Sequence, residues 1–153
     1  MTAGLEIVDV ETRLYAVPLA TVLADAMHGD HTHFELVTAT VTLCDGSRGT
    51  GYTYTGGRGG RAIRSVIADE LAPFVVGRDA VDVEGIARDM EFHLHYVGRG
   101  GIAGFGISAV DIALWDLRCR REDVSLARLI AGAPPGVVRA YHGGIDLGFT
   151  TEQ

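Results

Sequence analysis

Three histidines near the start of the chain form the first group of side chains that could do chemistry. His28, His31 and His33 are separated by two residues and then by one, and Asp25 and Asp30 lie among them. Imidazole and carboxylate groups are ligands that Zn²⁺ accepts, so a zinc site is one interpretation of this cluster. A zinc site needs ligands held on rigid elements, however, and these residues fall in a predicted loop. Solvated loop histidines are the alternative.

A glycine-rich stretch provides the second candidate site. It runs Thr55-Gly-Gly-Arg-Gly-Gly60, follows Tyr54 and precedes a predicted helix. Backbone N–H groups at a helix N-terminus can hold an anion, and Arg58 would add a bidentate contact to a carboxylate. A P-loop is excluded because no Gly-Lys-Ser or Gly-Lys-Thr follows. A plain connection from strand to helix is the other interpretation.

Two aspartates in an apolar run invite a paired-carboxylate interpretation, which their spacing rejects. Asp111 and Asp116 are five residues apart, or about 500° around a helix, so their side chains point roughly 140° apart. Asp116 precedes Arg120 by four residues, which predicts an ordinary ion pair. Because burial of an unpaired carboxylate is costly, we expect an arginine or backbone partner for Asp111.

Other motifs are interpreted as structural. Gly98-x-Gly100-x-x-Ala103 fits a loose dinucleotide fingerprint, but it follows a predicted helix rather than a strand. It indicates a tight turn, with Arg99 capping or pairing nearby. His93 and His95 are two residues apart, which on a helix places them on different faces, so each is taken as an ordinary core or surface histidine.

The residue types exclude several kinds of chemistry. All 13 basic residues are arginine, so these 153 residues offer no Schiff-base lysine, lysine general base or P-loop lysine. The net charge of −7 argues against binding to nucleic acid or to an anionic membrane surface. Cys44 and Cys119 do not form a disulfide framework, and no signal peptide is recognised, so the expected location is the cytoplasm.

The elements that must position these groups belong to the α+β class. We expect a three-stranded antiparallel β-meander followed by a helical bundle. Residues 5–17 alternate as a strand, with a bulge at Ile7–Val8, and the strand is expected to end at Pro18. Residues 18–32 are predicted as a loop. The other two strands are expected at 33–44 and 49–54, with a turn at Asp45-Gly46.

The helices follow in the second half of the chain. A central rod, Ile102–Leu117, is apolar on most sides and is therefore predicted to be buried. The remaining expected elements are helices from 61 to Pro73, from about 82 to Tyr96 and from Ser125 to Ala131, and a new strand over 137–144.

This order of features resembles the N-terminal half of the enolase superfamily, in the mandelate racemase / muconate lactonising enzyme group. The segment Ile107-Ser-Ala-Val-Asp-Ile-Ala-Leu-Trp-Asp-Leu117 carries most of the resemblance. The stretches from Tyr52 to Ile63 and from His95 to Ile102 are most similar to acid-sugar dehydratase members such as the talarate/galactarate dehydratases.

The resemblance implies a capping domain over residues 1–135 and the start of a truncated (β/α) barrel over 136–153. In such enzymes Mg²⁺ and the acid/base residues sit at the ends of barrel strands, and the metal stabilises an enediolate. The family's Lys-x-Lys pair, its His/Asp pair and its three acidic metal ligands would lie beyond this sequence. The expected chain is therefore a cap that is inactive alone, with no catalytic residue, no metal ligand and no cofactor, although Mg²⁺ is expected for a full-length relative.

The same resemblance implies which residues touch the substrate. The predicted loop with His28 and His31 corresponds to the mobile loop that closes over the substrate, and the glycine-rich loop also faces it. Six residues are expected to contact a sugar acid if a barrel is supplied: His28, His31, Tyr54, Thr55, Arg58 and His142, the last at the end of the presumed first barrel strand.

Two other functions stay open from the sequence. Without a barrel, the helices would leave an apolar patch uncovered, which implies association or poor solubility. The chain would instead be a stand-alone oligomerisation or interaction module if it used the meander and the central rod to dimerise or to cap another chain. It would be a small complete enzyme if the histidine cluster formed the active site. Homo-oligomers through the exposed apolar face are the expected partner in the first case.

Overall fold

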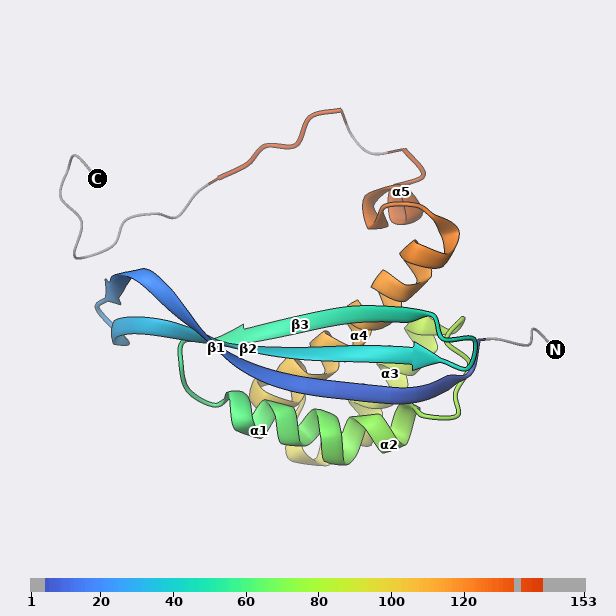
Figure 1. The fold of residues 1–153 in the computed structure, drawn as a ribbon, viewed down its shortest axis with the longest axis horizontal. Coiled ribbons are helices and arrows are strands. Elements are labelled where there is room, and N and C mark those ends of the chain that lie inside the picture. The colour runs from blue at the N-terminus through green and yellow to red at the C-terminus, as the bar shows by residue number, and fades with distance from the viewer. Residues whose placement is uncertain (1–4, 134–135, 142–153) are drawn as a thin grey trace.

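The computed structural model describes residues 5–133 and 136–141. Three antiparallel strands form one sheet in the order β1-β2-β3, which confirms the predicted meander. The strands are β1 (Ile7–Asp25), β2 (Gly29–Leu43) and β3 (Arg48–Thr55). The β1–β2 hairpin is much longer than β3 and projects beyond the helices at one end of the molecule (Figure 1).

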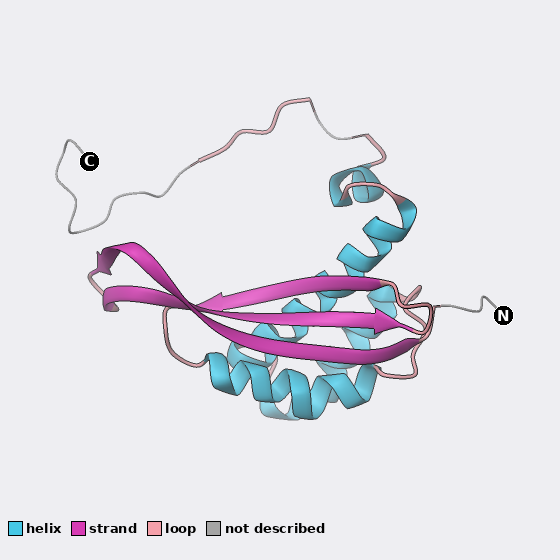
Figure 2. Ribbon diagram, viewed as in Figure 1, coloured by secondary structure: helices cyan, strands magenta, loops and turns pink. Residues whose placement is uncertain are grey.

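Helices cover one face of the sheet, as Figure 2 shows. Their inner sides and the inward residues of the strands form one core, which includes Val37, Val41, Ile67 and Leu114. The helical segments are α1 (Gly60–Ser65), η1 (Val66–Leu71), α2 (Ala72–Val75), α3 (Val83–His93), η2 (His95–Val97), α4 (Gly101–Glu122) and α5 (Leu126–Ala131). The fold is thus α+β, as expected.

The predicted end of the first strand at Pro18 is wrong. β1 runs through Pro18 to Asp25, and the pairing with β2 shifts between Pro18 and Leu23. Proline lacks the N–H that a central strand needs, but β1 is an edge strand and an irregular register accommodates it. The predicted loop over 18–32 is therefore the two arms and the turn of a hairpin. The bulge predicted at Ile7–Val8 is confirmed by the register shift between Ile7 and Asp9.

The predicted helix end at Pro73 is also wrong. The helix that starts at Gly60 passes through a π-helical stretch, Val66–Leu71, and continues to Val75. The N–H of Ala72 donates to the carbonyl of Ile67, five residues earlier. Pro73 thus lies inside a continuous helix, and the wider π-helical turn directly before it accommodates the residue that has no N–H.

The predicted central rod is α4, and it is longer than expected, with 22 residues. The backbone of α4 packs directly against the backbone of β3. A Cβ placed on Gly51 would lie 2.0 Å from the carbonyl oxygen of Ala109, and one on Gly49 would lie 2.2 Å from that of Ala113. Only glycine allows the helix and the strand to approach so closely.

The strand expected over 137–144 is not found in its described part. Residues 136–141 have no strand pairing, and the side chains of Val137 and Tyr141 are almost fully exposed. A strand needs a hydrogen-bonded neighbour, and the meander lies elsewhere. Residues 142–144, which include His142, lie outside the described residues.

Candidate functional site

The tip of the β1–β2 hairpin gathers three side chains that could hold a ligand. The Oδ1 atom of Asp25 is 2.9 Å from Nδ1 of His28, and its Oδ2 atom is 3.1 Å from Nε2 of His31. One ligand atom from each of the three residues lies within 4.8 Å of the other two. The structure thus assembles part of the predicted histidine cluster. His33 and Asp30 are not in it, and the ring of His33 contacts the Thr32 hydroxyl instead.

The turn itself holds this cluster together. Asp25 Oδ1 accepts hydrogen bonds from the backbone N–H groups of Met27 and His28, both at 2.8 Å. Hydrogen bonds from His31 and from this turn hold the pKa of the Asp25 carboxyl well below its usual range, so the group is an anion at neutral pH. Gly29 pairs with Asp25 across the hairpin and adopts φ +71°, a turn conformation that favours glycine, so His31 lies diagonally opposite Asp25.

Aromatic packing fixes one of the two histidines. The His31 ring stacks on Phe34 at 5.9 Å, and Phe34 meets the edge of Tyr54 at 5.8 Å. The side chain of His31 is only 15% exposed, whereas that of His28 is 65% exposed. His31 is therefore a positioned group, and His28 is a solvent-facing one.

The glycine-rich loop lies directly against the histidines. A Cβ on Gly56 would lie 2.9 Å from Cε1 of His31, and one on Gly57 would lie 3.2 Å from Cε1 of His33. Two candidate groups that are more than 20 residues apart in sequence therefore form one surface, with Tyr54 exposed on it. We call this the hairpin-end surface: Asp25, His28, His31, Tyr54, Thr55 and Arg58.

Glu35 already occupies the helix N-terminus that was expected to hold an external anion. Its Oε2 atom accepts hydrogen bonds from the N–H of Gly60 at 2.7 Å and from the hydroxyl of Thr55 at 3.1 Å. The anion site predicted from backbone N–H groups is thus filled by the chain itself. The sequence holds a signal for this: Glu35 shares the alternation of the buried residues Val37, Ala39 and Val41, an unusual phase for a carboxylate.

Arg58 keeps a free guanidinium within the described part of the chain. Its side chain is exposed, and it takes part in no hydrogen bond or ion pair with residues 5–133 or 136–141. The charge that the sequence predicts as an anion contact is therefore available, although the backbone half of the predicted anion site is not.

The two aspartates of α4 do different things. Asp116 accepts hydrogen bonds from Arg120 at 2.7 Å, which confirms the predicted ion pair, and from the backbone N–H of Thr50 at 2.8 Å. It therefore ties the helix to the edge of β3.

For Asp111 the prediction of an arginine or backbone partner is wrong within the described residues. Asp111 interacts with the Trp115 indole instead. Burial, and then the nearby charge of Glu84, raise the pKa of the Asp111 carboxyl.

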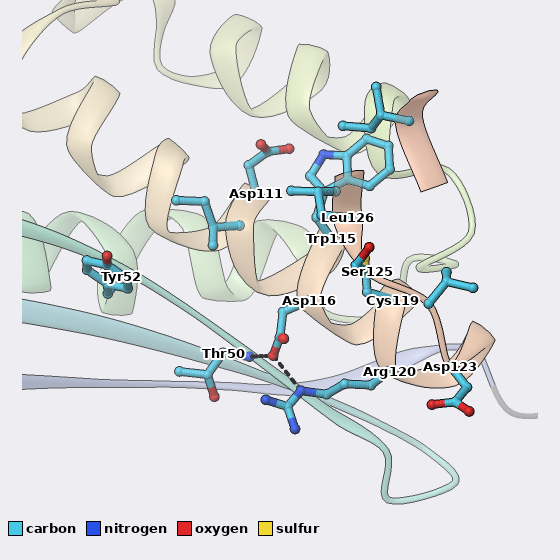
Figure 3. A pocket seen from close by; sticks show the side chains of 13 residues that line it. Thr50, Tyr52, Asp111, Trp115, Asp116, Cys119, Arg120, Asp123, Ser125 and Leu126 are labelled. Carbon is cyan, nitrogen blue, oxygen red and sulfur yellow. Dashed lines mark hydrogen bonds and ion pairs between the residues drawn. The ribbon is translucent and has the colours of Figure 1, made fainter. Parts of the chain in front are cut away.

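A groove of about 830 Å³ lies at the other end of the sheet, between β3, α4 and α5 (Figure 3). Apolar side chains line part of it, including Ile112, Leu126 and Ile130, which are 39%, 44% and 70% exposed, and polar side chains line the rest. In Figure 3 the carboxylate of Asp116 points away from Asp111 toward Thr50 and Arg120, so the two do not form a dyad. The apolar exposure predicted for the helices is thus present, while the association that it would drive stays a prediction.

The other candidates are structural in the described residues. His93 stacks on Phe74 at 4.3 Å, and His95 stacks on Phe92 at 4.9 Å. Gly98 to Gly100 form the tight connection into α4, as the turn interpretation predicts, and Ala103 lies in the first turn of that helix. Arg99 does not cap that helix, whose N-cap is Gly100 without a side-chain hydrogen bond.

The family profile of the mandelate racemase / muconate lactonizing enzyme N-terminal domain matches residues 5–131, which is most of the sequence. The chain belongs to this family. The resemblance drawn from the segment Ile107–Leu117 is thereby confirmed, and with it the enolase-superfamily fold of an N-terminal capping domain.

Individual members of the mandelate racemase / muconate lactonizing enzyme family are similar over most of this chain. A 3,6-anhydro-alpha-L-galactonate cycloisomerase of Streptomyces coelicolor is 47% identical over 138 residues, covering 90% of this chain and 38% of its own. An L-talarate/galactarate dehydratase of Salmonella typhimurium is 34% identical, covering 87% of this chain and 34% of its own. The chain therefore spans little more than a third of these relatives.

Solved structures agree. A racemase from Streptomyces coelicolor with bound magnesium has a TM-score of 0.74 at 46% identity, over 76% of this chain and 32% of that one. The Salmonella typhimurium L-talarate/galactarate dehydratase, liganded with Mg and L-lyxarohydroxamate, has a TM-score of 0.76 at 32% identity, over 84% and 34%.

The described residues do not fit the Mg²⁺ that these family structures contain. Mg²⁺ prefers an octahedron of oxygen ligands, whereas the three-residue cluster found in the described chain offers two imidazoles and one carboxylate.

None of the helices in residues 5–133 and 136–141 is long and apolar enough to cross a membrane.

Proposed function

We propose that this chain acts as the substrate-capping domain of an acid-sugar dehydratase or isomerase. The support is its family membership together with the sugar-acid names of its relatives, a cycloisomerase of 3,6-anhydro-alpha-L-galactonate and a dehydratase of L-talarate and galactarate. In this proposal the chain binds and encloses the substrate, and the rest of the enzyme carries out the reaction.

One observation carries the proposal. The projecting β1–β2 hairpin and the glycine-rich loop meet at the same end of the sheet, where Arg58 has a guanidinium without a partner in the described chain. Guanidinium binds a carboxylate through two parallel hydrogen bonds. Imidazole, phenol and hydroxyl groups beside it would suit the hydroxyls of a sugar acid.

The proposal assigns binding roles and no proton transfer. His28, His31, Tyr54, Thr55 and Arg58 contact the substrate, and His142, which lies outside the described residues, is proposed as a sixth contact. The hydroxyl of Thr55 already donates to Glu35, so Thr55 would act through its oxygen as an acceptor. Magnesium chemistry is assigned to the rest of the enzyme, because the donors found in the described residues do not suit that ion.

A chimera tests the proposal. Residues 5–131 would replace the matching segment of the Streptomyces coelicolor cycloisomerase, which is 47% identical, and kcat/KM for 3,6-anhydro-alpha-L-galactonate would be measured with Mg²⁺. We expect turnover by the chimera. A chimera that folds cooperatively and binds Mg²⁺ but shows no turnover would overturn the capping role.

The isolated 153-residue chain provides the matching control. With Mg²⁺ and the same substrate, or with L-talarate or galactarate, we expect no turnover above the buffer rate. Turnover by the isolated chain, reduced by substitutions in the hairpin-end surface, would replace the proposal with that of a small complete enzyme.

A further inference from the structure

The Asp25–His28–His31 cluster has the composition and convergence of a transition-metal site. Its three donor atoms are a carboxylate oxygen, the Nδ1 atom of one imidazole and the Nε2 atom of another, all within 4.8 Å. Measured from Asp25 Oδ2, the separations to Nδ1 of His28 and to Nε2 of His31 are already 3.0 and 3.1 Å. We propose that these three residues bind one Zn²⁺ ion at the hairpin tip.

The distances suit a tetrahedral ion. Zinc bonds to nitrogen and oxygen of 2.0–2.1 Å place the ligand atoms of a tetrahedron about 3.3 Å apart. The separations of Asp25 Oδ2 from the two imidazole nitrogens, 3.0 and 3.1 Å, differ from this value by a few tenths of an ångström. The two imidazole nitrogens lie within 4.8 Å of each other, and the exposed His28 ring has room to adjust.

The donor set selects against Mg²⁺. Two imidazoles and one carboxylate are a common ligand set for zinc, while Mg²⁺ prefers oxygen donors in an octahedron. No arginine of the described chain contacts the Asp25 carboxylate, so it is met only by imidazoles and backbone N–H groups.

The site is also held in place before an ion binds. The turn hydrogen bonds from Met27 and His28 fix the Asp25 carboxylate, and stacking on Phe34 fixes His31. Holding the ligands in advance reduces the ordering cost of binding. Three protein ligands leave the fourth position of the ion on the solvent side, where water or a ligand carboxylate would bind.

The inference uses His28 and His31, which are also proposed as substrate contacts, but its test does not depend on the proposed function, because zinc binding is measured on the chain alone. The untagged 153-residue protein, freed of metal with a chelator, would be titrated with ZnCl₂ by calorimetry and with CoCl₂ by visible absorption. We expect one ion per chain, a tetrahedral cobalt spectrum, and a thermal midpoint that rises with zinc concentration. A parallel titration with MgCl₂ should show no saturable binding.

Three variants and one matched control decide the ligands. Asp25→Asn keeps an oxygen acceptor for the turn, and His28→Gln and His31→Gln remove one imidazole each; each should weaken zinc binding at least about tenfold. His33→Gln, on the same strand but outside the cluster, should bind as wild type does. The proposal is overturned by absence of saturable zinc binding, by equal affinity in Asp25→Asn, or by loss of binding in His33→Gln.

Discussion

Glu35 is the residue whose role the structure changes most. Glu35 is a carboxylate in the buried phase of β2 that holds the N–H of Gly60 and the hydroxyl of Thr55, and so it joins the sheet to α1 at the hairpin-end surface. Arg58, His31 and Tyr54 could be predicted as candidate binding residues from the sequence, because their side-chain types are suited to binding a polar ligand. The role of Glu35 could not, because it depends on the loop that brings Gly60 back to the strand.

Replacing Glu35 with glutamine should destabilise the fold by about 1–2 kcal/mol, because a charge-assisted hydrogen bond to a helix N-terminus becomes a neutral one. The measurement is the free energy of unfolding from urea titration. Glu91→Gln, an exposed carboxylate on α3, is the matched control and should change that value by less than about 0.5 kcal/mol. Equal values for the two variants would remove Glu35 from this role.

Asp111→Asn should make the protein more stable at pH 7. Burial and Glu84 raise the pKa of Asp111, so the folded state prefers the protonated acid, and its ionised form lowers stability above that pKa. As pH falls below the usual carboxyl range, the wild-type residue becomes neutral and the difference should vanish. Thermal midpoints at pH 7 and pH 3 measure both effects.

Asp116→Asn is the matched comparison for Asp111→Asn on the same helix. Asp116 holds Thr50 and Arg120, so its neutral analogue should be less stable than wild type by about 1 kcal/mol. A stabilising Asp116→Asn or a destabilising Asp111→Asn at pH 7 would contradict the assignments of the two aspartates.

At the scale of elements, the prediction from sequence succeeded where side-chain period decides the structure. The meander and the helix α4 follow from side-chain alternation and from an apolar run. It failed at Pro18 and Pro73, where proline was expected to end the strand and the helix. The strand continues because it is an edge strand with an irregular register, and the helix continues because a π-helical turn precedes the proline. Such compensations depend on neighbours that a linear pattern does not contain.

The contact between α4 and β3 makes a sharp prediction. Gly51→Ala should destabilise the protein by about 3 kcal/mol or more, or prevent folding, because the new methyl group would meet backbone atoms of Ala109 and Ala113 that cannot move separately. Unfolding free energy and expression level measure this. Gly100→Ala has no atom within 4 Å of its new Cβ and should cost less than about 1 kcal/mol. Similar losses in both would show that the close approach is unimportant.

At the scale of the whole molecule, two surfaces lie at opposite ends of the sheet (Figure 1). The hairpin-end surface is polar and carries the groups proposed to touch a substrate, while the groove at α5 combines apolar side chains with charged ones such as Asp116 and Arg120. The family and the helix α4 could be predicted from sequence because the segment Ile107–Leu117 is specific. The contact between the β1–β2 hairpin and the glycine-rich loop could not be derived from sequence spacing. It depends on the length of the hairpin, which continues past Pro18.

The central claim is that this chain binds substrate and does not transfer protons, and Arg58 tests it most directly. In the chimera, Arg58→Ala and the control Arg64→Ala, an exposed arginine on α1, would be compared by kcat and KM. We predict that Arg58→Ala raises KM about tenfold or more with kcat nearly unchanged, because it removes binding shared by substrate and transition state, and that Arg64→Ala changes neither. An Arg58→Ala chimera with an unchanged KM, or with kcat abolished at constant KM, would contradict the account.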